Sequence, residues 1–379
     1  MTATQTPRSP AESEPASPGT ARRLVRTTLD ALLYPVIATA LAFAIGALLI
    51  LLTGNDPLAA FAALLRGGFG SARALGRTFV NATPLIFTGL AVALPFRAGL
   101  FNIGGEGQLY IGAVTAAWLG VALTGIPGPL AIVVILAAAG LAGFAWGTLP
   151  GLFKLRGAHE VITTIMLNFV AINLATWLLL GPLSGRGLVP GSAGVATANR
   201  LWSLGFGLGR ADWGLLLGLA AAAVAYALLW RTPRGFEIRA VGLAPGAARY
   251  AGMSVAANTV LAMAVGGLFA GIGGGVEVLG VFGKMPSPFV SNLGFNGIGV
   301  ALLGRNHPAG VVLGALFFGG LQGGAQEMQF ATDVPLDLAD VLLAIVLLLV
   351  TASRLVELLV GRRGGALAGS QRLEQGLGA

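Results

Sequence analysis

The chain has 379 residues, of which 55% are hydrophobic and only 10% are charged, and its formal net charge at pH 7 is +8. Soluble globular domains average about 25% charged residues, so this composition excludes two or three ordinary soluble domains and indicates one membrane domain. The absence of cysteine excludes disulfides, a thiol nucleophile and a cysteine metal site, and two histidines are too few for a histidine-rich metal centre.

Residues 1–28, in which Pro, Ser, Thr and Ala are frequent, are predicted to form a disordered cytoplasmic tail. A transmembrane domain over 29–355 follows, because a span needs about 20 apolar residues and many such stretches occur there. The apolar stretches are 31–55, 78–96, 107–153, 161–185, 213–230, 250–276, 285–304, 308–326 and 337–353. The turn-forming sequence Gly-Ile-Pro-Gly-Pro at 125–129 divides the long third stretch in two. We therefore predict an all-α membrane protein of about ten transmembrane helices, with a cytoplasmic C-terminal tail over 356–379.

The basic residues predict the orientation. When the N-terminus is placed inside the cell and the spans alternate, most of the 23 Lys and Arg residues fall on the inside. Cytoplasmic loops carry such an excess. We therefore predict a multi-pass protein of the bacterial inner membrane, with both termini in the cytoplasm. The positive net charge is then explained by this bias, and the expected partner is membrane lipid and not nucleic acid.

ATP hydrolysis is not expected on this chain. The phosphate-binding pattern G-x-x-x-x-G-K-[ST] is missing, because Lys154 and Lys284 stand in other contexts. No catalytic triad, zinc motif or dinucleotide fingerprint stands out either. We predict a non-enzymatic subunit without catalytic residues, metal or cofactor of its own, so that ATP and Mg would be held by a separate ATPase chain.

The first segment with functional residue types runs from Phe96 to Ala113 and holds Asn102, Glu106 and Gln108 among several glycines. Polar groups at membrane depth are costly unless they face protein or water, and glycines favour an irregular backbone like the broken helices of transporters. One hypothesis is therefore a broken or re-entrant segment that lines a solute path. The alternative is a cytoplasmic loop with Glu106 at a helix N-terminus, where a carboxylate is favourable.

The second segment, 231–252, is a basic loop after the sixth span. Thr232 suits an N-cap, Pro233 suits the first helical position, Gly242 suits the position after the helix end, and Pro245 begins a second short helix. One hypothesis is a coupling loop that docks an ATPase, and the alternative is a merely positive cytoplasmic loop. The predicted coupling residues are Arg234, Gly235, Phe236, Arg239 and Gly242.

The third segment, 291–308, contains Asn292 and Asn296. Its sequence Phe-Asn-Gly-Ile-Gly at 295–299 echoes Phe-Asn-Ile-Gly at 101–104, on a segment of opposite predicted direction. An inverted-topology repeat would give this pattern, and chance similarity is the alternative.

Two helices carry stripes at four-residue spacing. Glu160, Thr164 and Asn168 share one face of the fifth span, where path lining and interhelical hydrogen bonding are both open interpretations. The second stripe consists of glycines and predicts close helix packing. Its members are Gly267, Gly271 and Gly275.

The string Gly-Leu-Phe-Asn-Ile-Gly-Gly-Glu-Gly-Gln at 99–108 resembles a signature of the simple-sugar and nucleoside branch of ATP-binding cassette (ABC) importer permeases, relatives of the ribose and branched-chain amino acid permeases. Segments 231–252 and 291–308 resemble the same family, except that Ala244 stands where the family usually has Asn. The resemblance implies a type II importer-like fold. It also implies partners, namely ATP-binding subunits, a second homologous permease chain and an extracytoplasmic substrate-binding lipoprotein.

Three hypotheses for function follow. The first is the permease subunit of an ATP-driven importer for a small neutral polar solute, a nucleoside before a simple sugar, with branched-chain amino acids as the alternative within the family. The second is an ion-coupled secondary transporter, which would need buried acidic relays such as Glu106 and Glu160 and would leave the coupling loop unexplained. The third is a membrane enzyme or passive channel. The predicted path residues are Asn102, Glu106, Gln108, Asn168, Asn292 and Asn296.

Overall fold

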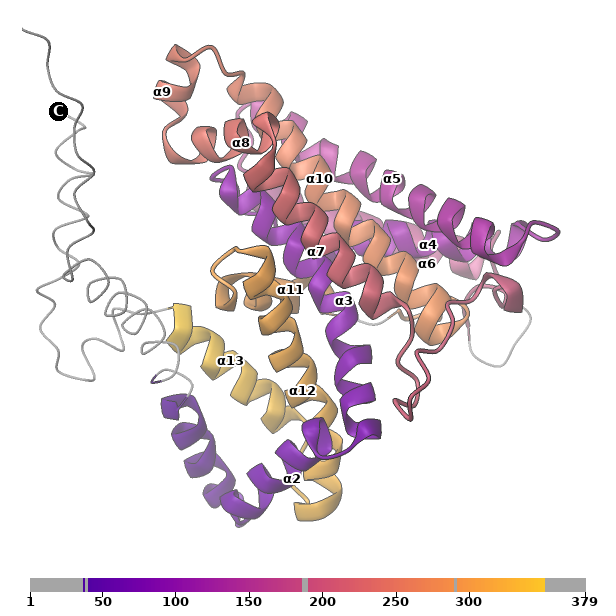
Figure 1. Ribbon diagram of the computed structural model, residues 1–379, viewed down its shortest axis with the longest axis vertical. Helices are drawn as coiled ribbons and strands as arrows, with labels where there is room; N and C mark the ends of the chain where they lie inside the picture. The colour runs from indigo at the N-terminus through magenta and orange to yellow at the C-terminus, as the bar shows by residue number, and fades with distance from the viewer. Residues whose placement is uncertain (1–36, 38–39, 186–189, 290–291, 352–379) are drawn as a thin grey trace, which may run out of the picture. The chain divides into compact units, whose positions relative to one another are not determined.

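The computed structural model describes residues 37, 40–185, 190–289 and 292–351 (Figure 1). The predicted tails at 1–28 and 356–379 lie outside the described residues. The chain divides into two compact units, 1–44 with 348–379 and 45–347. Of the first unit only residues 37, 40–44 and 348–351 are described, and they are helical. The side-chain contacts and the site described below lie in the second unit.

Helices make up all the regular elements of the described residues, apart from isolated β-bridges. The prediction of an all-α membrane protein is confirmed. The elements are α2 (Pro57–Phe69), α3 (Ala72–Arg97), α4 (Gly105–Ala122), α5 (Gly128–Leu155), α6 (Glu160–Leu180), η1 (Thr197–Asn199), α7 (Gly214–Arg231), α8 (Pro233–Leu243), α9 (Pro245–Tyr250), α10 (Val255–Val276), the π-helix η2 (Glu277–Phe282), α11 (Leu293–Leu303), α12 (Pro308–Thr332) and α13 (Asp337–Thr351).

Within the described ranges, six helices are long and apolar enough to cross a membrane. A seventh is added if the pair Ala40–Leu52 and Pro57–Phe69, bent by 119°, is one broken span. Ten is therefore an approximate count. The predicted span over 285–304 is the clearest difference, because its described residues 285–289 and 292 are not helical and the 11-residue α11 begins at Leu293.

Glycine allows α10 to pack closely against both α4 and α5, which run beside it. A methyl group added at Gly271 would overlap the carbonyl oxygen of Ala139 in α5, and one added at Gly112 of α4 would overlap the backbone of Gly271. Gly267 and Gly143 approach each other in the same way. Small residues let helix backbones approach in a membrane, where no hydrophobic force drives helices together. The predicted packing role of the glycine stripe is confirmed.

The helix ends define two faces of this unit. On one face, which we call the α8 face, α8 lies beside the end of α3, because the backbone of Gly242 approaches that of Arg97, and α9 follows α8. Arg97 also donates to the carbonyl of Asn306, just after α11 (2.9 Å). In Figure 1, α8 and α9 sit at one end of α7 and α10. The opposite face, the far face, holds the loop between α6 and α7, where Asn199 bonds to the end of α4.

Candidate functional site

Asn102, in the turn between α3 and α4, and Gln108, in the first turn of α4, are both buried. The two amides bond to each other, with Asn102 Nδ2 donating to Gln108 Oε1 (3.1 Å) and Gln108 Nε2 donating to Asn102 Oδ1 (3.3 Å). Asn102 Nδ2 also donates to the carbonyl of Ala91, inside α3 and well before its end at Arg97 (3.0 Å). The chain therefore folds back into the helical layer after α3, as the prediction of a broken segment requires.

Glu106, in the first turn of α4, reaches across to the start of α11. Its carboxylate is 2% exposed and accepts hydrogen bonds from the backbone N–H groups of Asn292 (3.1 Å) and Gly294 (2.6 Å). The first N–H groups of a helix lack partners within the helix, and a negative charge there is stabilised by the helix dipole. Glu106 thus caps a helix that is far away in the sequence, and it joins the first and third segments.

The helices α4 and α11 begin side by side and run in opposite directions. α4 ends at the far face, where the carbonyl of Leu123 accepts from Asn199 Nδ2 (2.9 Å). α11 ends at the α8 face, where Arg97 Nη2 donates to the carbonyl of Arg305 (3.1 Å). This is the geometry that an inverted repeat gives, and such half-helix N-termini meet at the binding sites of several transporters.

Asn168 of α6 caps α4 much as Glu106 caps α11. Its Oδ1 atom accepts from the N–H of Gly107 (2.8 Å), and its Nδ2 atom donates to the carbonyl of Ile103 (2.9 Å). The side chain of Asn168 is nearly completely buried. α6 therefore holds the start of α4, which in turn holds the start of α11.

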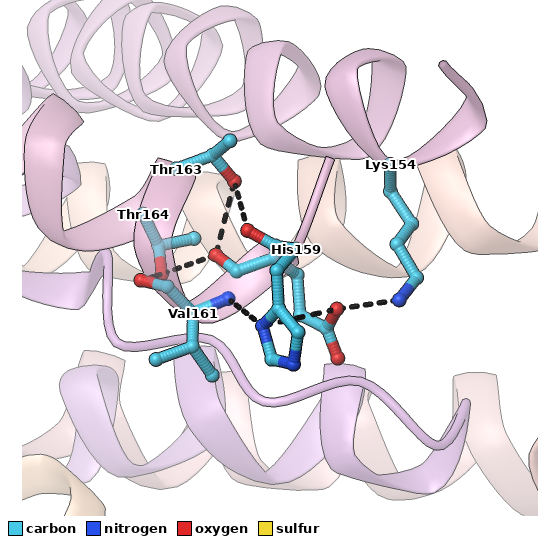
Figure 2. A network of polar contacts seen from close by, with 6 residues as sticks. Lys154, His159, Val161, Thr163 and Thr164 are labelled. Atoms are coloured by element: carbon cyan, nitrogen blue, oxygen red, sulfur yellow. Dashed lines mark hydrogen bonds and ion pairs between the residues drawn. The ribbon is translucent and has the colours of Figure 1, made fainter. Parts of the chain in front are cut away.

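The beginning of α6 is fixed by an ion pair (Figure 2). Lys154 Nζ, at the end of α5, lies 2.6 Å from a carboxylate oxygen of Glu160. Thr164 Oγ1 donates to the carbonyl of Glu160 (2.7 Å). Glu160, Thr164 and Asn168 are all buried. Glu160 connects α6 to α5 and Asn168 connects it to α4, whereas Thr164 bonds within α6.

The other two predicted path residues differ from Asn102, Glu106, Gln108 and Asn168. Asn292 is exposed and Asn296 is half-buried. Neither side chain makes a hydrogen bond to any part of the chain that the structure describes. The structure thus divides the six predicted path residues into four whose polar atoms are bonded internally and two whose amides are available.

The coupling-loop residues form two short helices, as predicted. The Thr232 hydroxyl accepts from the N–H of Gly235 (3.0 Å), and Pro233 and Pro245 stand at the first positions of α8 and α9. The prediction that Gly242 follows the helix end is wrong, because α8 continues to Leu243 and Ala244 is its C-cap. Gly242 is required inside the helix, since a methyl group there would overlap the carbonyl oxygen of Arg97.

The five predicted coupling residues do not share one surface. Gly235 is buried against the backbone of Leu228 and Leu229, and Arg239 Nε donates to the carbonyl of Leu229 (3.0 Å). By contrast, Phe236 is 55% exposed. Gly235, Arg239 and Gly242 therefore hold α8 in place. Arg234 and Phe236 remain accessible, together with Leu243 and Tyr250, which are 86% and 98% exposed and which sequence reasoning missed.

An aromatic cluster that the sequence did not reveal supports the α8 face from within. Two guanidinium groups lie close to the Trp230 ring, with Arg97 5.4 Å and Arg239 5.6 Å from its centroid. The imidazole of His307, the N-cap residue of α12, lies 4.9 Å from the same ring. Burial lowers the pKa of His307, and the charge of Arg97 lowers it further. The imidazole is therefore neutral at pH 7 and does not repel the guanidinium.

α8 is also tied to α10 by Glu237. Its carboxylate accepts from Asn258 Nδ2 (3.0 Å) and pairs with Arg234 (3.2 Å). The hydrogen bond from Asn258 is the largest influence, and it holds the pKa of Glu237 below its usual value. The ionised form is thus the one present at neutral pH.

Two acids are buried toward the far face. Asp212 Oδ1 accepts from the N–H of Gly214 and so caps α7 (2.7 Å). Burial raises the pKa of Asp212 to about 6. Glu277, at the start of η2, is 4% exposed, and its Oε1 atom has no hydrogen-bond partner in the described structure. No group of metal-binding side chains occurs among the described residues.

Comparison with known proteins identifies the family. A family model described as the permease component of a branched-chain amino acid transport system matches residues 74–351. This chain belongs to that family. The match spans α3 to α13 and so includes the capped helices and the coupling loop. No solved structure matches the chain.

Several curated relatives are similar over nearly their whole length. The guanosine ABC transporter permease protein NupP of Bacillus subtilis is 39% identical over 88% of this chain and 97% of its own. The glucose ABC transporter permease protein TsgB13 of Haloferax volcanii is 36% identical over 84% and 87%. The nucleoside ABC transporter permease protein NupB of Lactococcus lactis is 32% identical over 86% and 93%. The chain is therefore a multi-pass permease subunit of the ABC transporter type.

Proposed function

We propose that this permease carries nucleosides across the bacterial inner membrane as part of an ATP-driven importer. The observation that carries the proposal is the similarity, over nearly the full length, to permeases named for guanosine and for nucleosides. A simple sugar is the second candidate, because a glucose permease is 36% identical. ATP and Mg would be bound by separate ATPase chains, since this sequence has no phosphate-binding loop.

The α8 face is, in this proposal, the cytoplasmic face, because the basic loop 231–252 lies there. Both termini would then be cytoplasmic. Bacillus subtilis has a second guanosine permease, NupQ, which is 27% identical to this chain over 64% of it. We therefore expect a second homologous permease chain beside this one, and an external substrate-binding lipoprotein that selects the solute.

The solute path would run along α11. Asn292 and Asn296 offer amides that are not used internally. A neutral polyol needs such groups to replace its water, whereas Asn102, Glu106, Gln108 and Asn168 would hold the frame around the path. Contacts in a transport path must be weak enough for the solute to leave.

Substrate choice is tested by uptake of labelled guanosine into cells that carry the complete transporter. We expect unlabelled inosine and adenosine to compete with guanosine, and glucose and leucine to have no effect. A nucleoside site forms hydrogen bonds with both the sugar hydroxyls and the base, and neither glucose nor leucine offers both sets of groups. Competition by leucine with none by inosine would indicate a branched-chain amino acid permease, and competition by glucose alone would indicate a sugar permease.

ATPase docking is tested at the accessible residues of α8 and α9. Leu243→Glu and Tyr250→Glu are expected to reduce ATP hydrolysis by the assembled transporter about 30-fold, because charging an apolar hot spot costs about 2 kcal/mol or more. Leu243→Met is the matched control, since it keeps the apolar side chain at the same position. Uptake that persists in all three variants and collapses with the proton gradient would favour the secondary transporter.

A further inference from the structure

A cavity of about 470 Å³ opens on the far face of the structure. It lies between the first turns of α3 and the last turns of α12, and the loop before α7 and the end of η2 complete its wall. Neither the coupling loop nor the buried amide cluster contributes to it. Its polar lining consists of three arginines and three amides: Arg73, Arg77, Arg210, Asn81, Gln322 and Gln326.

The charge in this cavity is one-sided. Arg73 and Arg77 stand four residues apart on α3, a spacing at which like charges destabilise a helix. Arg210 brings a third guanidinium from the loop. The lining contains no Asp or Glu, and none of the three arginines forms an ion pair within the described residues. A bound anion would offset this repulsion.

Two of the guanidinium groups are held in place and still have donors to spare. Arg77 Nη2 donates to the carbonyl of Gly67 (3.0 Å), and Arg210 Nη2 donates to the carbonyl of Val281 (2.8 Å). The Nε–H of Arg77 is buried and has no partner among the described residues. That atom is closed to solvent, so the donors left for a ligand are the other N–H groups of these guanidinium groups. Guanidinium groups match phosphate geometry especially well.

The three amides add a neutral hydrogen-bonding surface. Asn81, Gln322 and Gln326 make no side-chain hydrogen bond to the chain that the structure describes. They differ in this respect from Asn102 and Gln108, whose amides bond to each other. Free amides can donate to and accept from hydroxyl groups. A cavity of about 470 Å³ is also in the range of small-molecule sites, so it holds more than a bare phosphate.

We propose that this cavity binds a phosphate ester with a hydroxyl-bearing substituent. The arginines hold the phosphate and the amides bond the hydroxyls. Such a group can come from a soluble nucleoside monophosphate or from the headgroup of an anionic lipid such as phosphatidylglycerol. The site is separate from the path proposed along α11, so it stands or falls independently of nucleoside transport.

The chain contains no cysteine, which allows a direct test. Gln322→Cys is made in the full-length chain, reconstituted in phosphatidylcholine nanodiscs, and its rate of reaction with a maleimide is measured. We expect guanosine monophosphate at about ten times its Kd to slow labelling about tenfold, and guanosine at the same concentration to have no effect. In nanodiscs with phosphatidylglycerol, labelling that is already slow and is unchanged by the nucleotide would identify the lipid as the source.

Controls separate protection from structural change. Phe206→Cys, where the native side chain is 93% exposed, should be labelled at one rate in every condition. Arg73→Gln combined with Gln322→Cys should lose the protection. Gln326→Cys repeats the measurement if Gln322→Cys does not fold. Protection by guanosine alone would overturn the proposal in favour of a neutral solute site. Labelling that neither phosphate ester nor lipid changes would overturn it outright.

Discussion

Gly271→Ala is expected to destabilise the folded chain strongly, because the backbone of α5 leaves no room for a methyl group at this position of α10. The added methyl group would overlap the Ala139 carbonyl oxygen and crowd the Cα atom of Gly143, both in α5. Both obstacles are backbone, which cannot move away as a side chain can. Overpacking usually costs about 1–3 kcal/mol, and we expect a loss at or above the upper end of that range.

The measurement is the temperature at which the detergent-purified protein loses its monodisperse peak in size-exclusion chromatography. Gly246→Ala is the matched control, since no atom lies within 4 Å of the added methyl group at that position in α9. The control should keep the wild-type temperature, while Gly271→Ala should lower it or abolish the peak. Equal temperatures for the two variants would mean that α4, α5 and α10 pack less closely than the structure shows.

The helices and the glycine contacts of α10 could be predicted because they depend on local pattern. Apolar length predicts a span, and the four-residue glycine spacing at 267, 271 and 275 predicts a packing face. Thr232 and Pro233 likewise predicted the start of α8, where the Thr232 hydroxyl accepts from Gly235. In each case the cause lies within a few residues of its effect.

The features that the sequence did not predict depend on partners distant in the chain. Gly242 looked like the residue after a helix end, but its role is set by the carbonyl oxygen of Arg97. The span over 285–304 looked continuous by composition, yet residues 285–289 and 292 are not helical, and Glu106 caps the helix where it begins. The phosphate-ester cavity likewise combines α3, α12 and a loop. No pattern of spacing within one segment can indicate these contacts.

Glu106 provides the most informative substitution at the junction of α4 and α11. Glu106→Ala removes the acceptor of two backbone N–H groups, those of Asn292 and Gly294. Leaving a buried donor unpaired costs about 1–3 kcal/mol, so the variant should lose about 2–6 kcal/mol if water does not replace the carboxylate. We expect a lower unfolding temperature and little or no guanosine uptake.

Glu106→Gln separates the two roles that this residue can have. Glutamine keeps one acceptor oxygen but loses the charge that the N-terminus of α11 favours, so the unfolding temperature should fall less than in the alanine variant. If the carboxylate serves as a cap, uptake should decrease in proportion to stability, with the apparent KM for guanosine unchanged. A KM that rises while stability stays at the wild-type value would instead place Glu106 in contact with the solute. The dependence of uptake on the proton gradient tests the remaining alternative, a secondary transporter. If Glu106 were an acidic relay, wild-type uptake would depend on the proton gradient and Glu106→Gln uptake would not. If Glu106 is a cap, ATP drives uptake in both proteins.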